Sequence, residues 1–339
     1  MTDELDLLRA ANPVRADAGP WRDRPLDAHA ERGLNRLLHS RRTRRAGRRL
    51  ALRAEAAVFA LVAVLAFAFS DAGTSTAAAA PAALVLRTDA PPLSLDELAR
   101  RAEARARTAG AHAGPRRGSH LQSWYMSMEA GPDAAPPVTV PEERITRWRA
   151  DGSGSELVVA TDPRHPGRPV INDADGRWRT VNDGKVLHRK TYPAGSGARH
   201  GGFTSRTKPP TDAGKLREFL ATVYGGADAA DVTTPQLLPA LSAFRQEWTP
   251  GPRETAAMVR MLADTGELRP AGSVTDRLGR RGQAYVYDGP DGSLNATRQV
   301  VVLDPVNGQL LGSEITFTKD LPDFEVKSGE VLSYEAWMP

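Results

Sequence analysis

The sequence contains no cysteine among its 339 residues. Disulfides, thiolate metal sites, a cysteine nucleophile and a lipidated lipoprotein N-terminus are therefore excluded. Lysine is also scarce, because only 6 of the 45 basic residues are lysine and the other 39 are arginine. This skew indicates a GC-rich coding sequence and carries no mechanism.

Motifs that would name a reaction are missing as well. The sequence has no GxSxG, no HExxH, no GxGxxG and no GxxxxGK, the patterns of common nucleophile, zinc and phosphate sites. The histidines show no metal-ligand spacing. We therefore expect a non-enzymatic protein with no catalytic residue, no metal site and no cofactor. Residues 276–282 (DRLGRRG) could bind an anion, but a charged turn leading into a strand is favoured.

Positive charge is concentrated at the N-terminus and is lacking elsewhere. Residues 1–53 carry 13 Arg against 7 acidic residues, a net charge of +6. Residues 71–339 carry 32 basic against 33 acidic residues, a net charge of −1. The isoelectric point of about 9.5 therefore reflects the N-terminal arginines, whereas residues 71–339 are close to neutral. Because a nucleic-acid-binding domain carries its basic surface on a folded face, we expect no nucleic-acid partner.

One long apolar run is present, over residues 50–69 (LALRAEAAVFALVAVLAFAF), with charges only at Arg53 and Glu55. A helix of this length spans about 30 Å, the thickness of a bilayer core. We therefore predict one transmembrane helix over residues 50–70 in the lipid bilayer. Its uncharged part, residues 56–69, is short.

The flanks of this run predict its orientation. No basic residue follows the run until Arg87. Because positive charge stays on the cytoplasmic side and contacts anionic headgroups, we predict a single-pass plasma-membrane protein with its N-terminus in the cytoplasm. Six arginines just before the run carry this prediction: Arg41, Arg42, Arg44, Arg45, Arg48 and Arg49.

Three alternatives compete with a membrane span. They are a buried helix of a soluble domain, a signal peptide cleaved near residues 77–80, and an arginine tract that binds nucleic acid. The arginine flank and the Ala/Pro-rich segment after the run argue against the first. A leader of about 50 residues is too long for an ordinary secretory signal.

Residues 1–49 form the predicted cytoplasmic arm, which is basic and helical. A helix over about residues 27–40 would carry an apolar stripe on one face. Such a stripe cannot bury itself on a short arm, so residues 1–40 are expected to bind a cytoplasmic protein; a weakly helical tail is the alternative. The stripe consists of Leu26, Ala30, Leu34, Leu37 and Leu38.

The remaining sequence predicts a linker over residues 71–93 and an extracytoplasmic domain over residues 94–339. Ser94 and Glu97 form a capping box that starts a helix ending near residue 108. Helical periodicity recurs near residues 216–224, from residue 234, and near 253–264. Strand patterns occupy residues 121–129, 143–149, 156–161, 177–181, 185–192, 283–287, 298–303, 309–318 and 331–337.

This order of elements predicts an α+β fold, a curved antiparallel sheet with helices packed on one face. Alternation over residues 311–318 predicts a strand with one buried face. Four strand residues, Trp124, Met126, Trp148 and Trp178, could line a ligand cavity inside a half-barrel. Plain core packing of these side chains is the favoured alternative.

Several motifs together resemble a known family. They are residues 3–9 (DELDLLR), the arginine run with its single span, and residues 148–153 (WRADGS), 275–282 (TDRLGRRG) and 303–312 (LDPVNGQLLG). The chain resembles, over nearly its whole length, actinobacterial single-span membrane proteins of unassigned function, often encoded beside extracytoplasmic-function sigma factors. In element order the outer domain is also similar to the LolA-like half-barrel of lipoprotein carriers and periplasmic sigma-factor regulators.

The resemblance and the leucine stripe predict an anti-sigma-like membrane regulator. The outer domain would sense an envelope signal and the arm would bind a partner such as a sigma factor. The alternative is a carrier module whose half-barrel binds a lipid or another apolar ligand, with the arm serving only as an anchor.

Overall fold

The computed structural model describes residues 81–88, 91–110, 114–127, 138–162, 167–173, 177–194, 207–225, 232–288 and 297–338. The predicted arm, with its leucine stripe and six arginines, and the predicted span at residues 50–70 lie outside these ranges. The chain divides into units 1–54 and 55–339, and every described residue belongs to the second. Among the described residues, no helix has the length and apolar character needed to cross a membrane.

The strands of the described ranges form one large antiparallel sheet and one small hairpin. Along the large sheet the order is β6-β3-β2-β1-β12-β11-β10-β9-β8, and β7 (Trp248–Thr249) pairs with β1 off this path. The first half contains β1 (Arg116–Ser127), β2 (Val138–Trp148), β3 (Gly154–Ala160) and β6 (Lys185–Tyr192). The second half contains β8 (Arg269–Thr275), β9 (Arg281–Asp288), β10 (Thr297–Leu303), β11 (Leu310–Phe317) and β12 (Val331–Trp337).

The two halves join where β1 pairs with β12. Leu121 lies opposite Trp337 and Tyr125 lies opposite Ser333 in this antiparallel pair. The first and last strands of the domain are therefore neighbours, although more than 200 residues separate them in the chain. The three helices that lie between the two halves in sequence pack against the sheet instead of interrupting it.

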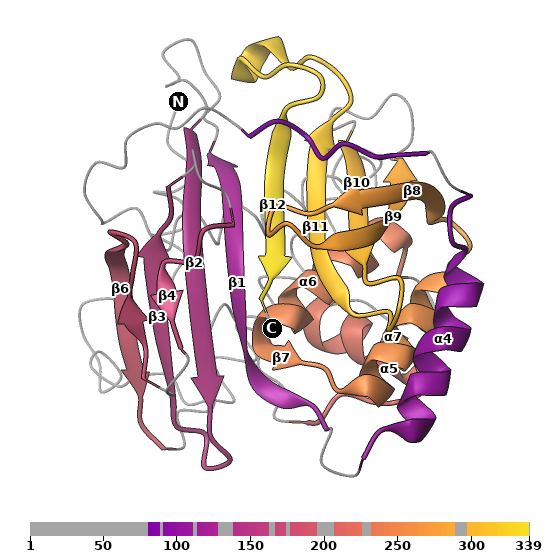
Figure 1. Ribbon diagram of the computed structural model, residues 1–339, viewed down its shortest axis with the longest axis horizontal. Helices are drawn as coiled ribbons and strands as arrows, with labels where there is room; N and C mark the ends of the chain where they lie inside the picture. The colour runs from indigo at the N-terminus through magenta and orange to yellow at the C-terminus, as the bar shows by residue number, and fades with distance from the viewer. Residues whose placement is uncertain are drawn as a thin grey trace, which may run out of the picture. The chain divides into compact units, whose positions relative to one another are not determined.

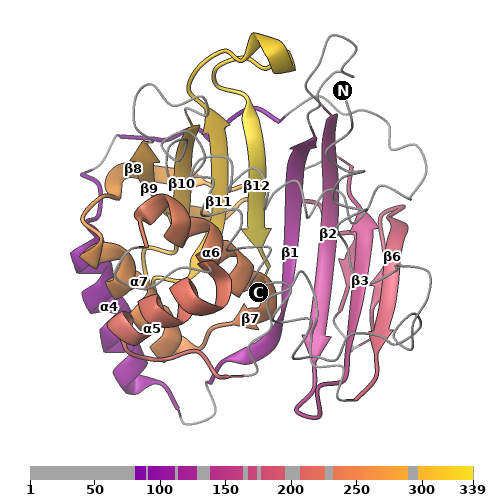
Figure 2. The same cartoon turned by 180° about the vertical axis from the view of Figure 1, so that it is seen from behind.

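The helices cover one face of the second half of the sheet, which Figure 2 shows from the helix side. They are α4 (Leu95–Thr108), α5 (Ala213–Leu220), α6 (Thr234–Glu247) and α7 (Pro252–Asp264), with α5 continuing into the π-helix η2 (Ala221–Gly225). Ser94 caps α4 by accepting a hydrogen bond from the backbone N–H of Glu97 at 3.2 Å. Leu98, Phe244 and Leu262 from the helices share one core with Tyr285 and Trp337 from the sheet.

The predicted α+β class, with a large antiparallel sheet and helices on one face, is thus confirmed for the described residues. Strand β8 (RPAGSVT) is absent from the predicted set. It contains Pro270 and Gly272, two residues that weaken a strand, and it tolerates them at the edge of the sheet. The strand expected at residues 177–181 is shorter, because β5 (Arg179–Thr180) pairs only with β4 (Ile171–Asn172).

The other face of the sheet is covered without helices. Residues 81–88, which we call the strap, cross β12, β11 and β10 on the side away from the helices (Figure 1). Leu84 and Leu86 of the strap pack against a cluster that includes Val300 and Val302. The prediction of one buried face for β11 is therefore wrong, since Glu314 on its other face is only 1% exposed. The strap also gives residues 81–88 a place in the domain, within the region predicted as linker.

Candidate functional site

The strap is joined to the sheet by backbone hydrogen bonds at β8. The N–H of Arg87 donates to the carbonyl of Ser273 at 2.8 Å, and the N–H of Ser273 donates back at 2.9 Å. This close approach requires Gly272, which has a φ of +100° and lies so near the strap that a Cβ atom would meet the Arg87 carbonyl oxygen at 2.1 Å. Glycine is suited to both demands, because it lacks a Cβ and adopts positive φ.

Two buried side chains of opposite charge hold the first part of the strap. Glu314 of β11 accepts a hydrogen bond from the backbone N–H of Leu84 at 2.8 Å. Arg277 donates to the carbonyl of Ala82 at 2.6 Å and to Glu314 at 2.8 Å. We call Arg277, Glu314 and Tyr334 the clamp, since the Arg277 guanidinium also lies 4.6 Å from the centre of the Tyr334 ring. The clamp thus ties the strap backbone to two strands and a turn.

Because the clamp residues are largely buried, the stability of the clamp depends on the ion pair between Arg277 and Glu314. Tyr334 and Glu314 are almost fully buried, and the Tyr334 hydroxyl accepts a hydrogen bond from the backbone N–H of Arg277 at 2.8 Å. Burial raises the pKa of Glu314, whereas Arg277 and the Leu84 N–H act in the opposite direction. An ion pair of this kind is costly to break, because one partner is then left buried without its counter-charge.

The charged segment at residues 276–282 turns out to be the turn from which Arg277 reaches the strap. Asp276 accepts hydrogen bonds from the backbone N–H groups of Leu278 and Arg280, at 3.0 and 2.8 Å. Arg280 donates to Asp276, to the carbonyl of Trp337 and to the carbonyl of Leu311. These charges therefore serve internal bonds, as the turn interpretation expects.

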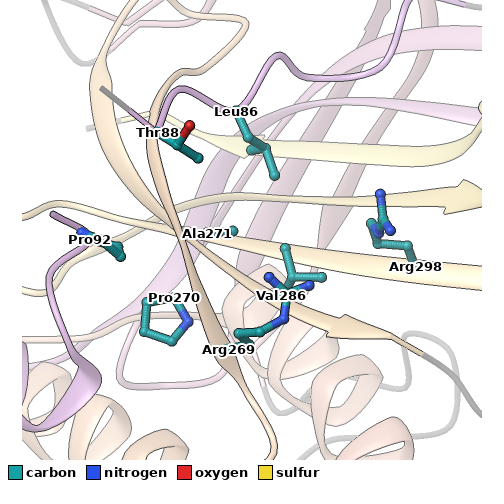
Figure 3. Close-up of a pocket in the computed structure, with 8 residues that line it drawn as sticks. All are labelled: Leu86, Thr88, Pro92, Arg269, Pro270, Ala271, Val286 and Arg298. Carbon is teal, nitrogen blue, oxygen red and sulfur yellow. The ribbon is translucent and has the colours of Figure 1, made fainter. Parts of the chain in front are cut away.

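A pocket of about 280 Å³ lies beside the strap (Figure 3). Its apolar walls come from Leu86, Pro92, Pro270, Ala271 and Val286. Thr88 and two arginines complete the lining, and the arginines, Arg269 and Arg298, both donate to Asp288, at 2.8 and 2.7 Å. Burial opposes ionisation of Asp288, but the hydrogen bonds from Arg298 and Arg269 lower its pKa. A molecule in this pocket would touch both the segment that follows the predicted span and the sheet.

A second polar group occupies the helix-facing side of the sheet, and we call it the polar row: Tyr125, Glu142, Arg144, Glu156, Tyr192 and Glu335. Glu335 of β12 accepts hydrogen bonds from Gln246 of α6 at 2.7 Å, from the Tyr125 hydroxyl at 3.4 Å, and from Ser242. Burial raises the pKa of Glu335. This carboxyl group therefore binds a proton more readily than an exposed glutamate.

Arg144 is the cation at the centre of the polar row. Its guanidinium donates to Glu142 and Glu156, at 3.0 Å in each case. Glu156 also accepts from the Tyr192 hydroxyl at 2.8 Å. Burial lowers the pKa of the neighbouring Arg245 to about 9, although Glu335 opposes this shift. The row therefore gathers three buried carboxyl groups, Glu142, Glu156 and Glu335, near the guanidinium of Arg144.

The structure separates the four side chains that were predicted as a possible cavity. Trp124 packs with Tyr334, at 5.4 Å between ring centres, on the strap side of the sheet. Met126 belongs to a different cluster that contains Phe317 and Leu332. Both are buried core residues, with exposed fractions of 1% and 6%.

Trp148 and Trp178 lie in two further places. Trp148 stacks on Tyr192 at 4.8 Å between ring centres. Trp178 packs on the cluster of Ile145 and Val159, and the Arg147 guanidinium lies 5.7 Å from its ring. The four predicted residues thus belong to separate packing groups, so the structure does not bring them together around one cavity.

Sequence reasoning did not find the clamp or the polar row. The alternation of β11 predicts that Glu314 lies on the exposed face of the strand. Nothing in the neighbouring sequence indicates that the strap covers this glutamate. Two histidines lie within the described ranges, and one of them, His120, lies within 2.7 Å of Glu143. Within the ranges that the structure describes, no group of three or more His, Asp or Glu side chains could hold a metal ion.

No protein-family model, no curated protein and no solved structure matches the chain. The function is therefore argued from the strap, the clamp and the chemistry around them.

Proposed function

We propose that the chain is a single-pass plasma-membrane regulator whose outer domain responds to an envelope signal and whose inner arm binds a cytoplasmic partner. The arginine flank and apolar run support the anchor, and the Leu26–Leu38 stripe supports a helical binding surface. The resemblance to membrane proteins encoded beside sigma factors makes a sigma factor the first partner to test.

The single observation that carries this proposal is the clamp on the strap. The strap begins 12 residues after the apolar run ends at Phe69. It is held by hydrogen bonds from the Arg277 guanidinium to the carbonyl of Ala82 and from the backbone N–H of Leu84 to Glu314. A change in the sheet that weakens these contacts would free chain next to the membrane, and such a two-state element is what a transmembrane signal requires.

The experiment follows the partner through the arm. The full chain is expressed with the sigma factor encoded nearest to it, and co-purification and sigma-dependent transcription are measured. We expect Leu34→Asp/Leu37→Asp to abolish co-purification and to release transcription, because two charges interrupt the stripe. Leu8→Asp, which lies on the arm outside the stripe, is the matched control. Unchanged co-purification and transcription in the double variant would sink the regulator proposal.

Coupling between the domain and the arm has its own test. Glu314→Gln removes the clamp's negative charge but leaves the arm untouched, so it should shift transcription towards the signalled state. A clamp variant that loosens the strap without any transcriptional effect would show that the strap does not transmit.

A second candidate function is a binding or carrier module. We propose for it a half-barrel, supported by β8 and β9 crossing the front of the sheet in Figure 1, and an apolar ligand, supported by the pocket of Leu86, Pro270 and Val286. Ala271→Leu would fill this pocket. Lipid that co-purifies with the wild-type chain and is lost from this variant would favour the carrier, whereas lipid-free protein would count against it.

A further inference from the structure

The strands of the first half of the sheet carry three buried glutamates, Glu142, Glu143 and Glu156. Glu142 and Glu156 pair with Arg144 in the polar row. Glu143 is fully buried and accepts hydrogen bonds from Gln122 at 2.9 Å and from the backbone N–H of Val170 at 2.8 Å. These three carboxylates are therefore hydrogen-bonded inside the fold and contribute little negative charge to its surface.

Many basic residues of the same region are exposed, although Arg144 lies in the polar row. Five exposed arginines surround the β4–β5 hairpin, which packs over Ile145 and Val159 on the side of the sheet opposite the helices (Figure 1). We call them the arginine face: Arg147, Arg168, Arg177, Arg179 and Arg189. Over residues 167–192 the sequence carries six Lys and Arg against three Asp, a net charge of +3, within a part of the chain whose net charge is −1. The near-neutral composition thus conceals a positive surface.

Several contacts shape this face. Arg147 pairs with Asp173 and lies over the ring of Trp178. Arg168 donates to the side chain of Asn182 at 2.9 Å. Arg189 lies opposite Leu157 in the β3–β6 pair, so its side chain emerges on the same side as the hairpin. Guanidinium groups bind phosphate oxygens in bidentate fashion, and a partly buried tryptophan with an apolar ring suits the headgroup zone of a bilayer.

We propose that the arginine face docks on anionic phospholipid headgroups of the membrane that anchors the chain. This inference rests on the proposed membrane anchor, but not on the regulator function. Charge complementarity selects an anionic partner. The length of the tether selects the membrane among such partners, because 12 residues extend to at most about 40 Å and keep the domain beside the bilayer at a high effective concentration.

The test uses the full chain in nanodiscs of neutral phosphatidylcholine or of phosphatidylcholine with phosphatidylglycerol. Amide hydrogen exchange over residues 177–192 is compared between the two. We expect exchange to be several-fold slower with the anionic lipid, and we expect high salt to remove the difference because it screens surface charge. Arg177→Gln/Arg179→Gln should lose most of the protection. The matched control, Arg105→Gln/Arg107→Gln on the exposed side of α4, should keep it.

Other outcomes overturn the proposal. Equal exchange in both lipids would exclude docking on the membrane. Protection that requires added polyphosphate would assign the arginine face to a soluble polyanion. An equal loss of protection in the control variant would show that net charge, and not the arginine face, causes the effect. A chain that does not enter nanodiscs would contradict the predicted anchor instead. Co-sedimentation with anionic but not with neutral vesicles would then still support docking by the arginine face, and equal co-sedimentation with both would exclude it.

Discussion

Arg277 and Glu314 lie 2.8 Å apart, and each also binds the backbone of the strap. One ion pair therefore connects β11 and the turn between β8 and β9 to the segment that follows the predicted span. Because the two side chains are only 9% and 1% exposed, breaking the pair would leave charge that is largely shielded from water. This property makes the pair the natural place to test whether the domain communicates with the predicted anchor.

Removing one charge of this pair should open the strap. We expect Glu314→Gln to reduce the free energy of unfolding by about 3 kcal/mol, because Arg277 is left buried without its counter-charge. Hydrogen exchange of residues 81–88 should accelerate more than that of α7. The double variant Arg277→Met/Glu314→Leu should be less destabilised than the single one, since it leaves no buried charge. Equal exchange in wild type and Glu314→Gln would contradict a holding role.

Crowding the strap without touching a charge should have a similar local effect. Gly272→Ala places a Cβ atom against the Arg87 carbonyl and strains a backbone with φ of +100°, so we expect a loss of about 1–3 kcal/mol together with fast exchange at residues 84–88. The control is Gly279→Ala, where φ is +79° and nothing lies within 4 Å of the added Cβ. If both variants loosen the strap equally, the close approach at Gly272 is not what matters.

The polar row should make stability depend on pH through Glu335. Burial raises the pKa of this carboxyl above its ordinary value of 4.5, so the folded state binds the proton more tightly than the unfolded chain does. The resulting stabilisation is complete below the unfolded pKa and is lost as the pH rises through the folded pKa. Glu335→Gln should flatten this decline, as measured by denaturant unfolding between pH 4.5 and neutral.

The groups facing Glu335 set the size of that effect. They are Tyr125 of β1, Glu142 and Arg144 of β2, and Ser242, Arg245 and Gln246 of α6. A suitable control is Glu97→Gln, because hydrogen bonds from Arg101 and Arg100 lower the pKa of Glu97. The contribution of Glu97 to stability therefore changes with pH in the opposite direction to that of Glu335. A pH profile that is identical in wild type and Glu335→Gln would show that this carboxyl does not titrate in the folded state.

The separated tryptophans should differ in what they contribute to stability. Trp124→Ala should cost about 3–5 kcal/mol, as expected for truncation of a fully buried aromatic side chain. Trp178→Ala should cost clearly less, because its ring is only partly buried. Thermal unfolding of the two variants checks the order. Loss of ligand binding without loss of stability in Trp124→Ala would restore the cavity hypothesis.

The sequence by itself determined the α+β class, the four helices and most of the strands of the domain. These features depend on local signals, namely the capping box at Ser94 and Glu97, the 3.6-residue periodicity around Leu216, and strand alternation bounded by Asp-Gly and Asn-Gly turns. Each signal is contained in a few neighbouring residues, so it can be read without knowing the fold.

Only the tertiary structure decided which distant segments meet. The pairing of β1 with β12, the docking of the strap on β8 and the bond between Leu84 and Glu314 join residues more than 180 positions apart. No local pattern marks such contacts, because a buried glutamate and an exposed one look alike until their neighbours are known. The same holds for surface charge: the balance of acids and bases is legible in the sequence, but only the fold shows that Glu142, Glu143 and Glu156 are buried while Arg177 and Arg179 are exposed.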